Sequence, residues 1–113
     1  SYLNYQAQRF NERFDANSYL YITKAMDYWD ATREYSNLGE VLAHWRKPTL
    51  IVSFDSDWLY PTRDAQAIAQ AIGDDARHIE LSSPAGHDAF LIEHVLQTPI
   101  IQQFLRQTAM VTA

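Results

Sequence analysis

The first part of the chain carries apolar side chains at the three- and four-residue steps of amphipathic helices. These positions are Tyr2, Tyr5, Phe10, Phe14, Tyr19, Ile22, Met26 and Trp29. Helix-starting residues interrupt the pattern at Asp15–Ser18, and a second break falls at Asn37 or Gly39. A short helix over Leu38–Trp45 follows, so the pattern predicts a helical segment over residues 1–45. Helices with so many aromatic residues need another surface to pack against, either a further domain or a second copy.

The second part, residues 46–113, changes to an alternation of strands and helices. The short apolar run Thr49–Phe54 is typical of a strand that is buried on both faces. A helix is predicted over Thr62–Ile72, with Gly73 as its stop, and a second strand over Arg77–Leu81. A further helix begins at Asp88 and runs to about residue 107, with a break at Pro99 left open.

This order of strand, helix, strand and helix predicts an α/β fold with parallel strands. Two strands alone do not form a stable parallel sheet, because both faces and both edges need cover. We therefore expect further strands upstream of this chain or in another molecule. The chain also begins without Met, in the middle of a helical pattern, from which we expect a fragment of a longer protein.

Polar side chains follow both predicted strands, in the loops Asp55–Pro61 and Ser82–Asp88. Functional residues of open α/β folds gather at the carboxyl ends of strands, so these loops can bring their side chains together. Asp57 and His87 stand in the order acid and then histidine, which is the order of the last two members of an α/β-hydrolase triad. The acid would fix the imidazole tautomer, and the ring would activate a hydroxyl nucleophile. Gly86 would permit a tight turn before the histidine.

Each of these residues also has a structural interpretation, since an Asp after a strand is commonly a turn or cap residue. The other three histidines, His44, His78 and His94, are interpreted as structural. A metal site is the competing chemistry, because carboxylates and imidazoles are metal ligands. Its possible ligands are Asp55, Asp57, His87 and Asp88. Their spacing fits no metal signature, so no metal is predicted.

The nucleophile of a triad has no candidate in this chain. The only glycines are Gly39, Gly73 and Gly86, and none flanks a serine in a G-x-S-x-G pattern. No oxyanion-hole motif is visible either. If the triad interpretation holds, these 113 residues alone cannot perform acyl transfer.

Composition and charge narrow the function classes. The net charge is −5, with nine Lys and Arg residues that form no basic stripe, which argues against nucleic acid as a partner. The chain has no Cys, which excludes disulfides and thiolate nucleophiles. No apolar run approaches the length of a membrane span, and no signal peptide is visible. The expected location is cytoplasmic.

Three segments resemble the homoserine O-acetyltransferase family, a branch of the α/β-hydrolase superfamily. They are Arg13–Tyr21, Asp55–Pro61 and Gly86–Glu93, and the likeness runs from about Ser1 to Leu105. The resemblance implies the C-terminal portion of an α/β-hydrolase fold, preceded over residues 1–45 by the end of a helical lid. It further implies transfer of an acetyl group from acetyl-CoA to the hydroxyl of L-homoserine, in methionine biosynthesis, with no bound cofactor.

The resemblance also implies roles for individual residues. Asp57 matches the catalytic acid of the family, His87 the general base, and Asp88 a position that contacts the amino group of the substrate. A carboxylate suits an ammonium group, although Asp88 can equally be the N-cap of the following helix. Succinyl-using relatives often carry an arginine two residues after the acid. Here that position is Leu59, which favours acetyl-CoA.

The resemblance places the serine, the oxyanion hole and the arginine that binds the substrate carboxylate upstream of this chain. It implies a homodimer formed through the lid helices. Two alternatives stay open, which are a hydrolase that uses water as the acceptor and a non-catalytic piece that dimerises through its aromatic helices.

Overall fold

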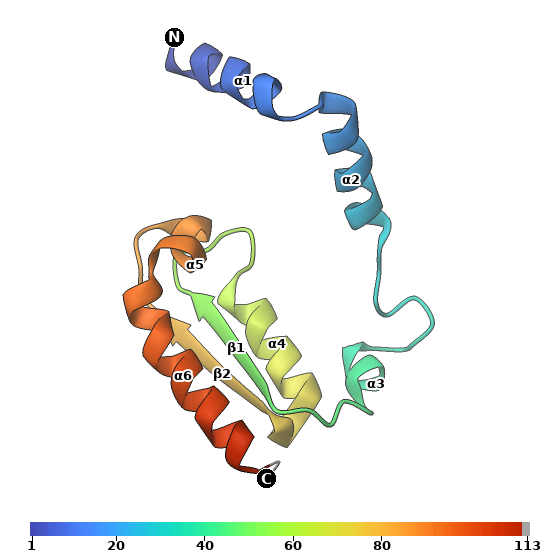
Figure 1. The fold of residues 1–113 in the computed structure, drawn as a ribbon. Coiled ribbons are helices and arrows are strands. Elements are labelled where there is room, and N and C mark those ends of the chain that lie inside the picture. Colours follow the sequence, from blue (N-terminus) through green and yellow to red (C-terminus); the bar gives the residue numbers. More distant parts are fainter. Residues whose placement is uncertain (112–113) are drawn as a thin grey trace. The chain divides into compact units, whose positions relative to one another are not determined.

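The structure, a computed structural model, describes residues 1–111. Thr112 and Ala113, the last residues of the predicted segment 46–113, lie outside this range. The chain divides into two compact units, Ser1–Glu34 and Tyr35–Ala113. Figure 1 labels the elements of both units.

The first unit consists of two helices, α1 (Tyr2–Arg13) and α2 (Ala16–Tyr28). The predicted interruption between them is confirmed, because the Asp15 carboxylate accepts a hydrogen bond of 2.6 Å from the Ser18 N–H and so caps α2. At the elbow, the ring of Phe10 stacks on Phe14 at 4.9 Å and meets Tyr19 edge to face at 5.4 Å between centroids.

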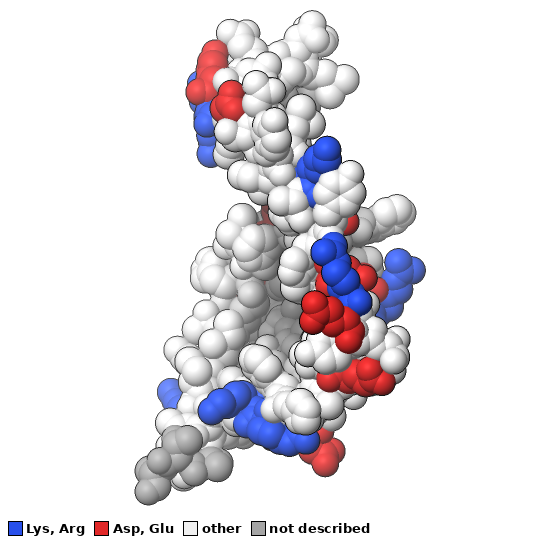
Figure 2. Space-filling model, turned by 90° about the vertical axis from the view of Figure 1, so that its right-hand side faces the viewer, with Lys and Arg blue, Asp and Glu red and all other residues white. Residues whose placement is uncertain are grey.

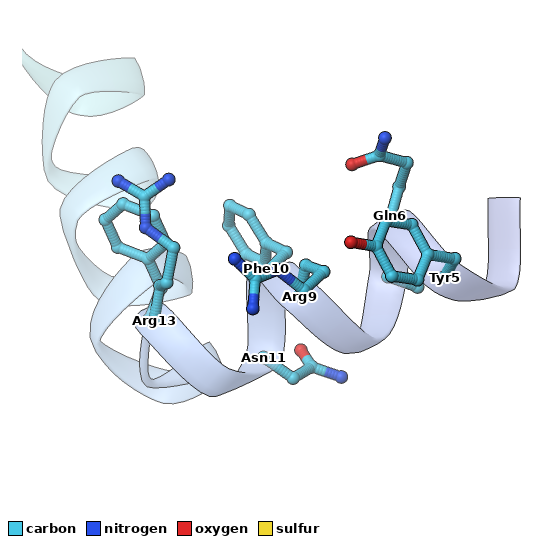
Figure 3. A pocket seen from close by; sticks show the side chains of 8 residues that line it. Tyr5, Gln6, Arg9, Phe10, Asn11 and Arg13 are labelled. Carbon is cyan, nitrogen blue, oxygen red and sulfur yellow. The ribbon is translucent and has the colours of Figure 1, made fainter. Parts of the chain in front are cut away.

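No residue of α1 or α2 is buried, so these helices have no core of their own. Figure 3 shows the side chains that line a hollow of about 660 Å³ on α1, among them Tyr5, Phe10 and Arg13. Large apolar side chains such as Tyr21 and Trp29 are 76% and 74% exposed. The first unit therefore presents apolar surface of the kind that marks interaction sites.

The second unit starts with α3 (Leu38–Leu42), which the Asn37 side chain caps through the Glu40 N–H at 3.0 Å. The predicted helix over Leu38–Trp45 is thus too long. The indole N–H of Trp45 instead donates to the Lys47 carbonyl and to the Thr49 hydroxyl, at 3.1 and 2.8 Å, and turns the chain into the first strand.

A parallel pair of strands forms the centre of this unit. Strand β1 (Thr49–Phe54) pairs with β2 (Ala76–Leu81), which starts one residue earlier than predicted. Helix α4 (Thr62–Ile72) connects them and contacts both. Gly73 ends α4 with a φ of 81°, as its position after the last apolar residue predicts. The α/β class and the parallel pairing are confirmed (Figure 1).

Burial of β1 is incomplete, which corrects the prediction of a strand covered on both faces. Only Ser53 and Phe54, at the carboxyl end of β1, are buried, and the other four residues are half-buried. The sheet within residues 1–111 has only two strands, so one edge of β1 has no strand beside it there. The apolar residues that are buried in the described part are Phe54, Ile72 and Ala89.

After β2 come a 3₁₀ turn (Gly86–Asp88) and two helices, α5 (Ala89–Ile92) and α6 (His94–Val111). The possible break at Pro99 does not occur, because α6 continues through Pro99. Proline removes one hydrogen bond of the helix, and α6 continues for 12 residues beyond it. The break lies at Glu93, which ends α5 with a φ of −85° and a ψ of 44°.

Charged side chains do not form a single large patch on the face drawn in Figure 2. Lys and Arg residues lie there in small separate groups, with Asp and Glu residues nearby. None of the helices within residues 1–111 is both long enough and apolar enough to cross a membrane.

Candidate active site

The loop after β1, here called the acid loop (Asp55–Pro61), folds around the carboxylate of Asp57. Its Oδ1 accepts hydrogen bonds from the backbone N–H groups of Leu59 and Tyr60, at 2.9 and 3.0 Å. This is an Asx-type turn, in which a short acidic side chain holds its own loop. The other oxygen, Oδ2, is left to face the neighbouring loop.

The loop after β2, here called the histidine loop (Ser82–Asp88), turns sharply at Gly86, whose φ is +61°. A residue without Cβ adopts this left-handed conformation without the strain that other residues meet. Ser83 is buried and supports the turn, since its hydroxyl accepts the Ala85 N–H at 3.2 Å and donates to Glu93 at 2.6 Å. The turn places His87 beside the acid loop.

Three successive residues of the acid loop bind the histidine loop. Asp55 accepts the Ser83 N–H at 3.1 Å. The Ser56 hydroxyl donates to the Ser83 carbonyl and accepts the Gly86 N–H at 2.9 Å. Asp57 Oδ2 lies 2.9 Å from His87 Nδ1. The structure therefore brings the predicted acid and histidine into direct contact, although they are 30 residues apart in sequence.

The environment favours an ionised Asp57. The backbone N–H of Tyr60, and after it the hydrogen bond to His87, holds the pKa of the Asp57 carboxyl below its ordinary value. The pKa of Asp55 is also lowered, first by the Ser82 side chain and then by the Ser83 N–H. The Asp57 side chain is only 9% exposed, whereas the His87 side chain is 33% exposed.

An ionised Asp57 can only accept, so Nδ1 of His87 carries the proton and Nε2 of the neutral ring has a free lone pair. Within residues 1–111 no hydrogen bond to Nε2 and none from a serine to His87 is present. The ring of His87 contacts those of Tyr60 and Phe90, with centroid distances of 5.1 and 5.2 Å.

Beside this pair is a cavity of about 450 Å³. Its lining is mostly apolar and includes Phe54, Ile68 and Phe90, with Asp57 and His87 among its few polar residues. Apolar pockets with a few convergent polar groups are the usual form of a small-molecule site. The arrangement can hold a base that is ready to accept a proton beside a mostly apolar cavity.

The two remaining predicted site residues lie close to the pair. Asp88 follows His87 directly and is exposed. It occupies the cap position of α5, but its side chain makes no capping hydrogen bond, so the structure does not support the N-cap interpretation. Leu59 lies at the exposed tip of the acid loop and is 69% exposed.

The other histidines have different surroundings. His78 Nε2 lies 2.8 Å from the Ser53 hydroxyl, on a strand and next to a buried serine. His94 Nδ1 lies 3.1 Å from the Ile92 carbonyl at the start of α6, and His44 is exposed. Within the part of the chain that the structure describes, no three His, Cys, Asp or Glu side chains are grouped as a metal site would need.

Sequence reasoning missed the residues that support the pair, which are Ser56, Ser83, Tyr60, Phe90 and Glu93. Serine in a turn after a strand is a known signal for side-chain hydrogen bonds to nearby backbone, and it was available here. The contact of Tyr60 with His87 had no such signal, because it joins two loops. Phe90 follows His87 by three residues, a spacing that brings side chains together on a helical turn.

Curated proteins named homoserine O-acetyltransferase are similar to this chain over most of its length. It is 44% identical over 112 residues to that of Carboxydothermus hydrogenoformans, an alignment that covers 96% of this chain and 30% of the relative. It is 49% identical over 108 residues to that of Methanocorpusculum labreanum, an alignment that covers 93% of this chain and 22% of the relative. By sequence, the chain belongs to the homoserine O-acetyltransferase family. The family predicted from three sequence segments is therefore confirmed.

The homoserine O-acetyltransferase of Pelagibacter ubique is 48% identical over 97 residues, which are 82% of this chain and 26% of that protein. The chain thus spans less than a third of the length of these three curated relatives. No model of a known protein family matches the chain.

Proposed function

We propose that this chain is part of an enzyme that moves an acetyl group from acetyl-CoA to the hydroxyl of L-homoserine, a step of methionine biosynthesis. The observation that carries the proposal is the contact between Asp57 and His87, 2.9 Å apart at the ends of adjacent parallel strands. Its family supplies the reaction class, because the relatives are named homoserine O-acetyltransferase.

In this proposal His87 acts as general base and Asp57 as its partner in a Ser-His-Asp triad, whose serine lies outside these 113 residues. Nε2 takes the proton of the serine hydroxyl while the serine oxygen attacks the thioester carbon. The same proton then goes to the departing sulfur of CoA, which leaves an acetyl-serine. In the second half, Nε2 takes the proton of the homoserine hydroxyl, whose oxygen attacks the acetyl carbon. The serine leaves with that proton. Asp57 stabilises the imidazolium of both halves.

Two residues beside the pair are proposed to select the substrates. The exposed carboxylate of Asp88 has no capping bond, so it is free to pair with the ammonium group of homoserine. Leu59 offers no charge to a succinyl carboxylate, which supports acetyl-CoA as the donor. We propose no bound cofactor and no metal, with acetyl-CoA acting as a substrate.

The complete protein is proposed to have an α/β-hydrolase fold, to which the upstream portion adds the strands that β1 lacks. Residues 1–45 are proposed as the end of a helical lid that also joins two copies into a homodimer. The exposed aromatic side chains of α1 and α2 support a packing partner for these helices. We propose a cytoplasmic location and do not propose nucleic acid or membranes as partners.

The test is release of the CoA thiol by the native-length protein, given acetyl-CoA with and without L-homoserine. We expect release that requires homoserine, that falls by about 10³-fold or more in a His87→Ala variant, and that is retained in a His44→Ala variant. His44 is the matched control because it is exposed, with no recorded side-chain bond within residues 1–111.

Release that is indifferent to homoserine would favour a hydrolase that uses water as the acceptor. No release, with a dimer that forms through residues 1–45, would favour the non-catalytic interpretation. Release that survives the loss of His87 would contradict the role of the Asp57–His87 pair.

A further inference from the structure

The imidazole of His87 has an aromatic ring on each of two neighbouring elements. Tyr60 comes from the acid loop, with its ring centroid 5.1 Å from that of His87 and its plane tilted by 46°. Phe90 comes from α5, at 5.2 Å and 51°. Both rings also line the cavity beside His87. The histidine is thus in contact with two aromatic rings in addition to Asp57.

An aromatic ring has a negative face that attracts a cation placed within about 6 Å of its centroid. Both distances at His87 lie inside this range. A neutral imidazole gains little from such rings, whereas an imidazolium gains from each of them. The contact therefore distinguishes the two protonation states of the base.

We propose that Tyr60 and Phe90 are positioning residues that stabilise the protonated form of His87. This inference deepens the proposed function, since a base that holds its proton between two transfers is what that mechanism requires. The protonation effect itself needs no catalysis, because it acts on the histidine whether or not a substrate is bound.

Two effects of the rings oppose each other, and the geometry indicates which is larger. Rings that cover an imidazole remove water, which disfavours the cation. However, the His87 side chain keeps 33% of its surface exposed, so it stays partly hydrated. Removal of one ring takes away its attraction for the cation, and we expect this loss to outweigh the added hydration.

The charged background is the same in all variants that test this idea. Within residues 1–111, the charged groups on the two loops, on α4 and at the end of α5 are Asp55, Asp57, Arg63, Asp64, Asp88 and Glu93. The five carboxylates favour the imidazolium and Arg63 disfavours it, and none of these six groups is changed below. A difference between variants then reports on the rings.

The first experiment is an NMR titration of the His87 ring in the native-length protein without substrates. We expect the midpoint of the titration curve to fall by roughly half a pH unit in Phe90→Leu and again in Tyr60→Leu. Phe90→Trp should keep or raise the midpoint, because Trp is the better partner for a cation. Tyr35→Leu is the matched control, since its ring lies in the same unit and makes no recorded contact with His87.

A midpoint that rises or stays constant in the leucine variants would overturn the proposal, because the rings would then act by excluding water or not at all. If these variants fail to fold, Phe90 is replaced by fluorinated phenylalanines. Fluorination weakens the negative face of the ring with little change in shape. The midpoint should fall stepwise with added fluorine, and a constant midpoint would again overturn the proposal.

Failure of this inference and failure of the proposed function remain distinguishable. The titration uses no substrate, so a falling midpoint in a protein without acyl transfer would support the ring effect and reject the reaction. A constant midpoint in an active acetyltransferase would reject the ring effect and support the reaction. In an active enzyme with the ring effect, the acidic limb of the pH profile of kcat/KM should move together with the midpoint.

Discussion

Ser56 joins the two loops of the candidate site through a single hydroxyl group, so Ser56→Ala is a sharp perturbation. The hydroxyl donates to the Ser83 carbonyl and accepts the Gly86 N–H. Alanine removes both hydrogen bonds and leaves the backbone and the apolar contacts in place. It also leaves the half-buried Gly86 N–H without its partner.

The expected cost follows from these two bonds. A typical hydrogen bond contributes about 1 kcal/mol net, and an unsatisfied group in a partly buried place adds to its loss. We therefore expect Ser56→Ala to lower the free energy of unfolding by about 2 kcal/mol. Replacement of an exposed serine changes the free energy of unfolding by only about 0.5 kcal/mol or less.

The assay is urea unfolding of the native-length protein, together with hydrogen exchange at the Gly86 amide. The control is Ser36→Ala, because Ser36 lies in the same unit, is exposed, and makes its recorded bond through its backbone N–H alone. Exchange at Gly86 should become about tenfold faster or more in Ser56→Ala and stay unchanged in the control. Equal stability and equal exchange in the two variants would refute the structural role assigned to Ser56.

Three further changes test other parts of the site. Gly86→Ala should cost roughly 1–2 kcal/mol of stability in urea unfolding, because alanine is strained at a φ of +61° while its Cβ would clear the Ser56 carbonyl at 3.7 Å. Because the pKa of Asp57 is lowered in the folded protein, its carboxylate stabilises the fold fully above the ordinary pKa of 3.8. This stability is lost as the pH falls through the pKa of the folded state. Asp57→Asn should therefore flatten this part of an acid-unfolding curve. Leu59→Arg should raise the use of succinyl-CoA relative to acetyl-CoA by roughly two- to fivefold, measured as a ratio of kcat/KM, and an unchanged ratio would remove Leu59 from donor selection.

Local sequence signals were sufficient for the elements that position the site. The strand Thr49–Phe54 and the helix Thr62–Ile72 have the predicted bounds. The strand is a short apolar run, and the helix combines a clear hydrophobic period with Gly73 as its stop. The position of Asp57 and His87 after adjacent strands followed from the topology alone. Their bond of 2.9 Å did not, since it depends on the hydrogen bonds that fold each loop.

The differences from the prediction arise where tertiary contacts decide. Pro99 is a strong local signal for a helix end, yet α6 passes through it, and the break falls six residues earlier at Glu93. There the Glu93 carboxylate accepts the hydroxyl of Ser83, ten residues away in sequence. A bond of this kind between a loop and a helix end has no periodic signature. The incomplete burial of β1 likewise depends on what lies beside its open edge.

All the hydrogen bonds that hold the Asp57–His87 pair come from residues 55–93. The acid loop holds its own carboxylate, and the histidine loop is held by Ser56, Ser83 and Glu93. Within residues 1–111, the hydrogen bonds that set the geometry of acid and base therefore all come from one unit. On the proposed function, the rest of the protein then needs to bring only a serine and its oxyanion donors to the free Nε2 of His87. Residues of β1, among them Phe54, line the same cavity as the imidazole, so the position of β1 also shapes the space beside the base.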